Sequence, residues 1–187
     1  MPARFEVLLS GSVRPGVTSS VSLVIDGDSV VVIDPGMVHA KGELISELAA
    51  RGLSPEQVTD VVVTHLHLDH TMNVGIFPNA TVHDFMASYK DDVWTDHDLD
   101  RFRVAPNVYA IATPGHTRED ISIVVISEAG MVVCTHAWWT RNGPRLDPYA
   151  FDQEVLEDSR ARVLAIGPSL IVPGHGAPFA PGELDLA

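Results

Sequence analysis

The hexapeptide His65-Leu66-His67-Leu68-Asp69-His70 directly follows the apolar run Val61-Val62-Val63, which predicts a buried strand. Neutral imidazole and carboxylate oxygen are ligands that divalent metals of borderline softness prefer in proteins. Side chains at the end of a strand can turn toward a common point, and alternation places His65 and His67 on the same side. This stretch therefore predicts a metal site at one edge of a sheet.

Two further histidines lie far along the chain, each just after an expected strand. His116 stands in Thr113-Pro114-Gly115-His116-Thr117, and His175 stands in Pro173-Gly174-His175-Gly176. Pro-Gly turns carry the chain off the edge of a sheet and direct one polar side chain into a cleft, where α/β proteins place their sites. The sequence thus supplies distant partners for the hexapeptide.

The apolar pattern predicts one domain over residues 1–187, folded as a mixed α/β sandwich. Asp26-Gly27-Asp28 separates two β-branched runs and predicts a hairpin. Helical spacing predicts a helix over 41–51, and Asp152 is expected to cap a second helix. The apolar positions expected on one face of that second helix are Val155, Leu156, Val163 and Leu164. Further strands are expected at 61–63, 81–82, 108–112, 121–126, 131–134 and 170–172.

Composition narrows the classes of protein. The chain has 187 residues, of which 45% are hydrophobic and 20% charged, and this is typical of a globular protein. No apolar run approaches the roughly 18 residues that span a bilayer, so we expect a cytoplasmic protein. The net charge of −13 would repel a phosphate backbone and makes nucleic acid an unfavourable partner. The single cysteine, Cys134, cannot form an internal disulfide and is expected to be buried.

Taken together, Asp34, the hexapeptide, His116 and His175 resemble the motifs of the metallo-β-lactamase fold superfamily, in the same order along the chain. The resemblance implies a four-layered αββα sandwich of two mixed sheets, with the metal centre at one edge. It implies that one metal is held by His65, His67 and His116, and a second by Asp69, His70 and His175. Asp34 would support the loop from behind. Segments 73–78, 159–164 and 173–179 are similar to a small single-domain branch called metallo-β-lactamase-domain-containing protein 1.

One position departs from the pattern of that superfamily. Most of its members with two metals carry Gly-Asp, with the aspartate bridging the ions, where this sequence reads Thr135-His136-Ala137. A neutral imidazole cannot bridge as a carboxylate does, so either His136 binds one metal terminally or the second ion is held more weakly. We expect His136 to be a ligand and zinc to be the metal, with two ions per chain. A single ion, or iron or manganese, stays open.

These ligands predict a metal-dependent hydrolase in which a metal-activated hydroxide, oriented by Asp69, attacks a small substrate. The substrate would be an ester, thioester, lactone, amide or phosphodiester. Three alternatives stay open: a nuclease for single-stranded RNA, a mononuclear iron oxygenase resembling the persulfide dioxygenases, and a non-catalytic metal-binding protein. The partner expected is a small molecule, which could be anionic. No membrane partner is expected, and the oligomeric state is open, with a homodimer among the options.

Some residues outside the motifs are weaker candidates for function. The Gly- and Pro-containing segment 10–20 resembles the mobile flap of the superfamily, and its Arg14 is a candidate for holding an anionic substrate. Trp138 and Trp139 follow His136, and one of them is a candidate stacking wall for substrate. His83 and His97 are expected to be structural or surface residues. The aspartate-rich segment 91–100 is expected to be a solvated loop.

Overall fold

The β-branched runs of the chain form two sheets in the computed structural model, which describes residues 1–98 and 100–184. The first sheet contains, in spatial order, β1 (Arg4–Leu9), β2 (Val21–Asp26), β3 (Ser29–Ile33), β4 (Asp60–Val62), β5 (Thr81–His83), β6 (Ala87–Lys90) and β7 (Val93–Asp96). The second contains β12 (Leu170–Pro173), β11 (Gly130–Thr135), β10 (Ile121–Ser127), β9 (Val108–Ala112) and β8 (Arg103–Ala105). Both sheets are mixed, as the resemblance implied.

Three α-helices are described: α1 (Lys41–Ala50), the short α2 (Leu68–Thr71) and α3 (Gln153–Ala165). Single 3₁₀ turns lie at Val38–Ala40, Pro55–Gln57, Val74–Ile76 and Pro181–Glu183. The carboxylate of Asp152 accepts hydrogen bonds from the backbone N–H groups of Glu154 and Val155, which confirms the predicted cap of α3. Among the described residues, none of the helices is long and apolar enough to cross a membrane.

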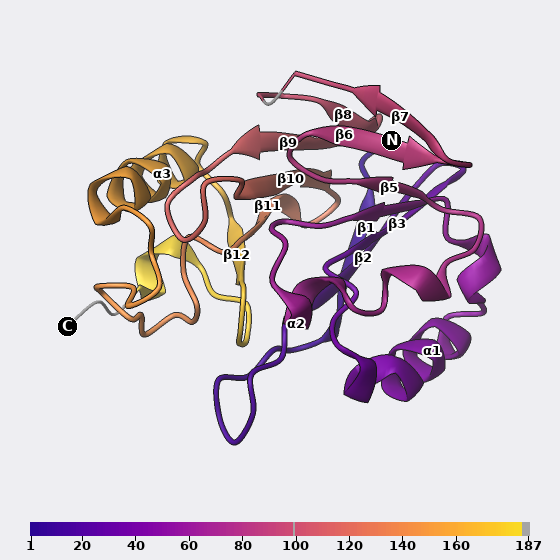
Figure 1. The fold of residues 1–187 in the computed structure, drawn as a ribbon, viewed down its shortest axis with the longest axis horizontal. Coiled ribbons are helices and arrows are strands. Elements are labelled where there is room, and N and C mark those ends of the chain that lie inside the picture. The colour runs from indigo at the N-terminus through magenta and orange to yellow at the C-terminus, as the bar shows by residue number, and fades with distance from the viewer. Residues whose placement is uncertain (99, 185–187) are drawn as a thin grey trace.

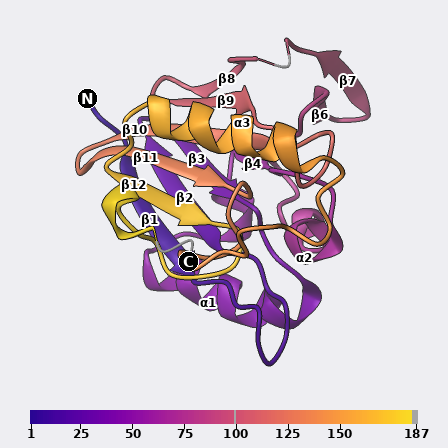
Figure 2. The ribbon, with the colours of Figure 1, turned by 90° about the vertical axis from the view of Figure 1, so that its left-hand side faces the viewer.

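The two sheets lie face to face, with α3 against one outer face and α1 against the other (Figures 1 and 2). Three apolar clusters correspond to the three interfaces of these four layers. Leu44 and Leu48 of α1 pack on the first sheet, and Leu156 and Val163 of α3 pack on the second. Between the sheets, the largest cluster joins residues of both, including Val31, Val62, Ile123 and Val132. The αββα architecture implied by the resemblance is confirmed.

Parallel pairing brings strand ends to one edge of the sandwich. β3 pairs in parallel with β4, β4 with β5, and β11 with β12. β9 and β11 both pair antiparallel with β10, so they also run in one direction. Because the carboxyl ends of parallel strands meet at one edge, the residues that follow these strands are brought near each other.

Two expectations about local structure were wrong, and some strands were not predicted. The segment 91–100 was expected to be a loop but contains β7, whose residues are all exposed, so no apolar alternation marks it. The strands β1, β6 and β8 were not predicted at all. Leu164 was placed on the buried face of α3 but is 39% exposed, while Leu156 and Val163 are buried. The buried residues of α3 are Leu156, Ser159, Arg160 and Val163, which follow the i, i+3, i+4, i+7 pattern of one helix face, and Leu164 lies just beyond the edge of that face.

Candidate metal centre

Four histidines come together because each follows a strand that ends at the same edge. His65 lies three residues after β4, His116 four residues after β9, His136 directly after β11, and His175 two residues after β12. All four are buried. His67 precedes α2 at its N-cap position and is exposed, whereas His70 lies within α2 and is fully buried. The structure therefore gathers the six predicted histidines from both sheets into one cluster.

The first half of the cluster consists of His65, His67 and His116. Nδ1 of His67 lies 3.1 Å from Nε2 of His65 and 3.1 Å from Nε2 of His116. Two ligands of a tetrahedral zinc ion, each 2.0–2.1 Å from the metal, are about 3.3 Å apart. The observed separations are close to that value. Nδ1 of His67 therefore lies from each of the other two nitrogen atoms at about the spacing of two ligands in a tetrahedral site.

The second half contains His70, His136 and His175. Nε2 of His136 lies 2.9 Å from Nε2 of His175, and the Nε2 atom of His70 has no hydrogen-bond partner although it is buried. The carboxylate Oδ2 of Asp69 is 3.5 Å from Nε2 of His70 and 3.8 Å from Nδ1 of His175. Imidazole nitrogens and a carboxylate oxygen thus converge at a second point.

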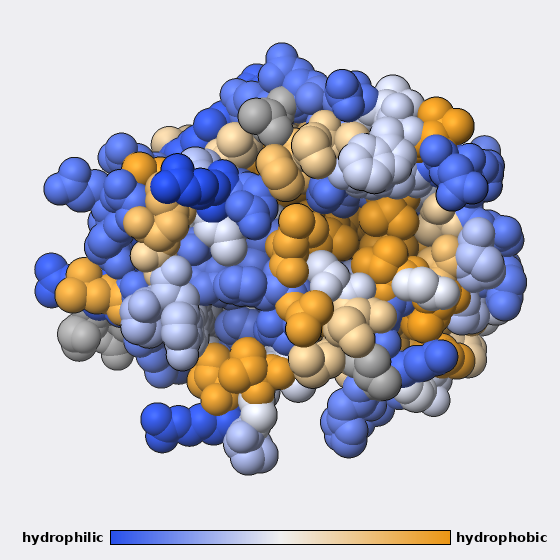
Figure 3. All heavy atoms as spheres, viewed as in Figure 1, coloured by the Kyte–Doolittle hydropathy of each residue, from blue (hydrophilic) through white to orange (hydrophobic). Residues whose placement is uncertain are grey.

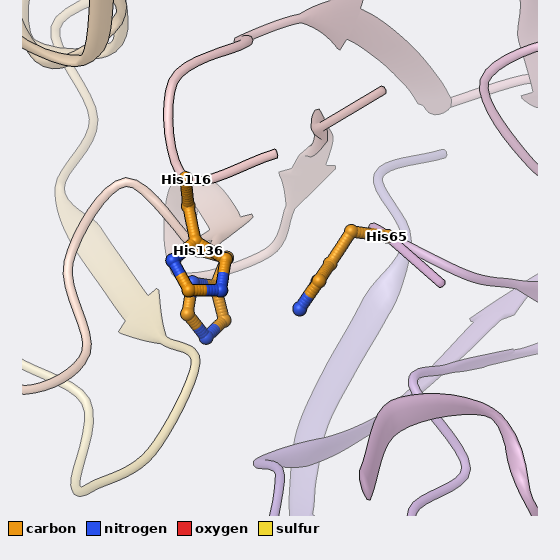
Figure 4. A group of neighbouring side chains, drawn as sticks. All are labelled: His65, His116 and His136. Atoms are coloured by element: carbon orange, nitrogen blue, oxygen red, sulfur yellow. The ribbon is translucent and has the colours of Figure 1, made fainter. Parts of the chain in front are cut away.

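His136 belongs to both halves. One group with ligand atoms within 4.8 Å of one another contains His65, His116 and His136, and another contains His70, His136 and His175. In Figure 4 the rings of His116 and His136 lie beside each other and His65 points toward them from the opposite side. The Gly174 backbone permits this position, because a Cβ there would lie 2.7 Å from Nε2 of His136.

The outer ring nitrogens of four histidines are held by other groups. Nδ1 of His70 donates to Oδ2 of Asp34 (2.9 Å), and Nδ1 of His175 donates to the Thr18 carbonyl (3.0 Å). Asp34 also accepts hydrogen bonds from the backbone N–H and the hydroxyl of Thr64. Because that hydroxyl donates to Asp34, it accepts from Nδ1 of His65 at 3.2 Å. Asp34 thus lies behind the loop, as the resemblance implied.

The fourth partner is Asp147, which the sequence analysis did not identify. Its Oδ2 accepts from Nδ1 of His116 at 2.7 Å and from Nε1 of Trp139 at 2.8 Å. Burial acts to raise the pKa of Asp147, but hydrogen bonds from His116 and the Tyr149 backbone hold it below its usual range. Asp147 lies in a loop that resembles neither a strand end nor a recognisable motif, so no local signal in the sequence marked it.

Burial lowers the pKa of several imidazoles that face the centre. Burial lowers the pKa of His65 well below its usual range, and the nearby His70 and His116 lower it further. Burial also lowers the pKa of His136 well below its usual range. A divalent metal requires neutral imidazole, and holding one ring nitrogen orients the other toward the ion. With the buried, unpartnered Nε2 of His70, these donors fit a divalent cation.

A pocket of about 340 Å³ opens onto the cluster. It is lined by Val17, His67, Asp69, His116, Trp139, Tyr149 and His175. Trp139 therefore borders the site, while Trp138 is 1% exposed and packs against Phe179 in the core, which excludes Trp138 as a substrate wall. Arg14 is exposed and does not line the pocket in this structure. A cavity of about 360 Å³ near Phe5 and Leu170 carries no histidine.

Residues expected to be structural have structural environments. The ring nitrogens of His83 contact Ser88 Oγ at 2.7 Å and Asp60 Oδ1 at 2.8 Å. His97 stacks on Phe102 with ring centroids 3.7 Å apart. Cys134 is buried, and burial raises the pKa of its thiol to about 12. None of these three residues belongs to the histidine cluster.

Comparisons with known proteins agree with this geometry. The family model described as metallo-beta-lactamase superfamily matches residues 14–105. The chain is 35% identical over 172 residues to metallo-beta-lactamase domain-containing protein 1 of Xenopus laevis, covering 83% of this chain and 70% of the frog protein. It is 36% identical to the human protein of that name over 159 residues, covering 80% of this chain and 59% of the human protein.

Solved structures show the same fold. A metallo-beta-lactamase family protein of Thermus thermophilus superposes with a TM-score of 0.74 at 19% identity, covering 97% of this chain and 76% of that one. An N-acyl homoserine lactone hydrolase with its product bound superposes with a TM-score of 0.67 at 18% identity, covering 93% and 92% of the two chains.

Proposed function

This chain belongs to the metallo-β-lactamase superfamily, and from that premise we propose that it is a zinc-dependent hydrolase of a small ester, thioester, lactone, amide or phosphodiester. The observation that carries the proposal is the convergence of six imidazoles and Asp69 beside one pocket, with the outer ring nitrogens of four of these imidazoles held by hydrogen bonds. Such a donor set suits zinc, and the open pocket leaves room for a substrate.

We assign the ligands to two ions. His65, His67 and His116 would hold one ion, and Asp69, His70 and His175 the other, with His136 within reach of both. Divalent zinc would lower the pKa of a coordinated water toward about 7 and polarise the oxygen of a carbonyl or phosphoryl group. A single ion, or iron or manganese in place of zinc, is the alternative that metal analysis must decide.

The side chains of the protein have separate parts in this proposal. Asp69 is only partly buried and borders the pocket, so its carboxylate can accept a hydrogen bond from the attacking water and hold its orientation. Asp34 and Asp147 hold the proton on the outer nitrogens of His70 and His116, which fixes the ring tautomers. Trp139 restricts the access of bulk water on one side of the pocket.

Elemental analysis of the purified and the reconstituted protein tests the proposal. About two zinc ions per chain, together with hydrolysis of a panel of esters, lactones and phosphodiesters, is the expected result. One tightly held iron would favour the oxygenase alternative, and the absence of tight binding would overturn the metal assignment. Asp69→Asn should lose turnover while its thermal stability changes little; full activity with normal metal content would remove Asp69 from the mechanism.

The cellular context also remains a proposal. We propose a cytoplasmic enzyme that acts on a small molecule, and nucleic acid stays the less favoured partner because the chain carries a net charge of −13. A nuclease would bind single-stranded RNA with affinity that falls steeply as salt rises. Salt-independent or absent RNA binding is therefore expected, and sedimentation analysis decides whether the protein is a homodimer.

A further inference from the structure

Two aromatic rings form a flat surface at the pocket. The rings of Trp139 and Tyr149 are stacked, with centroids 5.6 Å apart and planes 3° from parallel. One carboxylate holds both residues, because Asp147 accepts from Nε1 of Trp139 at 2.8 Å and from the backbone N–H of Tyr149 at 2.9 Å. We call this stacked pair, Trp139 and Tyr149, the aromatic wall. It is fixed in place before any ligand binds.

The aromatic wall lies beside both halves of the histidine cluster. The Trp139 ring centroid is 6.1 Å from that of His116 and 5.9 Å from that of His175. Tyr149 is 70% exposed although one face of its ring is covered by Trp139. A group attached to a carbonyl bound at the centre would therefore lie near an accessible aromatic surface.

Exposed apolar side chains also lie on the segments that supply residues to the pocket. Val17 lines the pocket, and on the loop of the wall Leu146 is 69% exposed. Leu66 and Leu68, which flank His67, are 50% and 61% exposed. Figure 3 shows hydrophobic side chains gathered over the loop between β1 and β2 and around α2. Exposed apolar patches of this kind mark sites that bind apolar ligands or partners.

The pocket offers no positive side chain to an anionic group on the substrate. Across the described part of the chain, the residues that line it include neither lysine nor arginine. A carboxylate placed against the wall, on the side away from the metal ligands, would lose its hydration and meet no positively charged side chain, which is unfavourable. The wall therefore suits an uncharged group.

We propose that the aromatic wall binds the acyl or aryl group of the substrate, so that the enzyme prefers uncharged esters, thioesters or lactones with an apolar acyl group. This inference rests on the proposed hydrolase function and names the class of substrate for the same site. It also replaces the expectation of an anionic substrate held by Arg14, since the apolar surface lies at the pocket and Arg14 does not.

A series of S-ethyl thioesters with the same small leaving group tests the preference. From thioacetate to thiooctanoate, each buried methylene is expected to raise kcat/KM of the zinc-loaded enzyme about two- to fourfold. The S-ethyl ester of monothioadipate, whose acyl chain ends in a carboxylate, should react much more slowly than thiohexanoate. Equal rates along the series, or faster reaction of the carboxylate-terminated thioester, would overturn the proposal.

Variants distinguish the effect of the aromatic wall on chain-length preference from general effects of substitution on the protein. Tyr149→Ser should reduce the preference for thiooctanoate over thioacetate at least fivefold, because it removes the exposed ring. Trp139→Phe, which keeps a ring, should retain more of that preference than Trp139→Ser. Trp94→Leu is the matched control, since Trp94 is 67% exposed on β7 and outside the pocket. A loss of preference in Trp94→Leu equal to that in Tyr149→Ser would contradict the assignment.

Binding without turnover distinguishes this inference from the proposed function. Calorimetric titration with 2-decanone, a neutral ketone that is not hydrolysed, should give binding that Tyr149→Ser weakens at least fivefold. If 2-decanone binds in this way while no thioester is hydrolysed, the wall is supported and the hydrolase proposal fails. If thioesters are hydrolysed but Tyr149→Ser changes neither chain-length preference nor ketone affinity, the hydrolase proposal stands and the wall is refuted.

Discussion

Replacing Asp147 by asparagine changes a single atom at the carboxylate that holds His116. Oδ2 of Asp147 accepts two hydrogen bonds, from Nδ1 of His116 and Nε1 of Trp139, and Oδ1 accepts one from the backbone N–H of Tyr149. The amide of asparagine has one acceptor oxygen. If its NH₂ group replaces Oδ2, it faces two donors; if it replaces Oδ1, it faces one. Either orientation leaves a buried donor without an acceptor.

The expected magnitude follows from this loss. An unsatisfied buried donor costs about 1–3 kcal/mol. The favoured escape is a change of tautomer, in which Nδ1 of His116 accepts from the asparagine NH₂ and Nε2 carries the proton. That tautomer directs an N–H at the metal, so metal affinity should fall about 10- to 100-fold. Such a change equals about 1.4–2.8 kcal/mol of binding free energy.

Competition with a chromophoric zinc chelator measures the affinity, and thermal unfolding of the metal-free protein measures the stability. The metal-free variant should unfold several degrees lower, at roughly 2–4 °C per kcal/mol for a domain of this size. Asp152→Asn is the control, because asparagine caps a helix about as well as aspartate and Asp152 only contacts the first turn of α3. Zinc affinity of Asp147→Asn within twofold of the unsubstituted protein would refute the reasoning.

Three other predictions follow from packing and burial. Gly174→Ala should displace His136 and reduce the zinc bound per chain, while Gly176→Ala, whose Cβ would meet nothing closer than 3.4 Å, should bind zinc normally in the same elemental analysis. Cys134, buried with a thiol pKa near 12, should resist iodoacetamide in the folded protein and react after unfolding, as mass spectrometry would show. Burial raises the pKa of Asp120 to about 6, so the folded protein binds this proton more tightly than the unfolded chain does. Its contribution to stability is complete below about pH 4 and is lost as the pH rises through about 6, and Asp120→Asn should flatten this dependence in denaturant titrations.

The histidines that face the centre could be predicted from the sequence, because the pattern that indicates each of them is local. His65, His116, His136 and His175 each follow a strand of β-branched or apolar residues, and parallel pairing then brings strand ends together without further information. Asp34 was placed correctly only through the resemblance to a family, since nothing near it in the sequence indicates that its carboxylate reaches Thr64 and His70.

The outer part of the site depends on loops whose paths are set by tertiary contacts. Asp147 reaches His116 across 31 positions of sequence, and the Thr18 carbonyl reaches His175 across 157. Every residue has a backbone carbonyl whatever its side chain, so no sequence pattern can indicate the role of the Thr18 carbonyl. The two tryptophans show the same limit: strand parity cannot decide which of Trp138 and Trp139 enters the core once the chain has left β11.

The carboxylates of Asp69, Asp34 and Asp147 determine how much positive charge two bound ions would keep when residue 136 is a histidine. Two divalent ions would bring four positive charges, and the one carboxylate beside them, Asp69, would leave three. Asp34 and Asp147 add two negative charges, but each lies behind an imidazole and accepts a hydrogen bond from its outer nitrogen. There they make His70 and His116 stronger donors to a metal without occupying a coordination position. With a neutral imidazole at 136 in place of a carboxylate, more of the positive charge of two bound ions would act on a coordinated water or carbonyl oxygen, which would favour ionisation of the water.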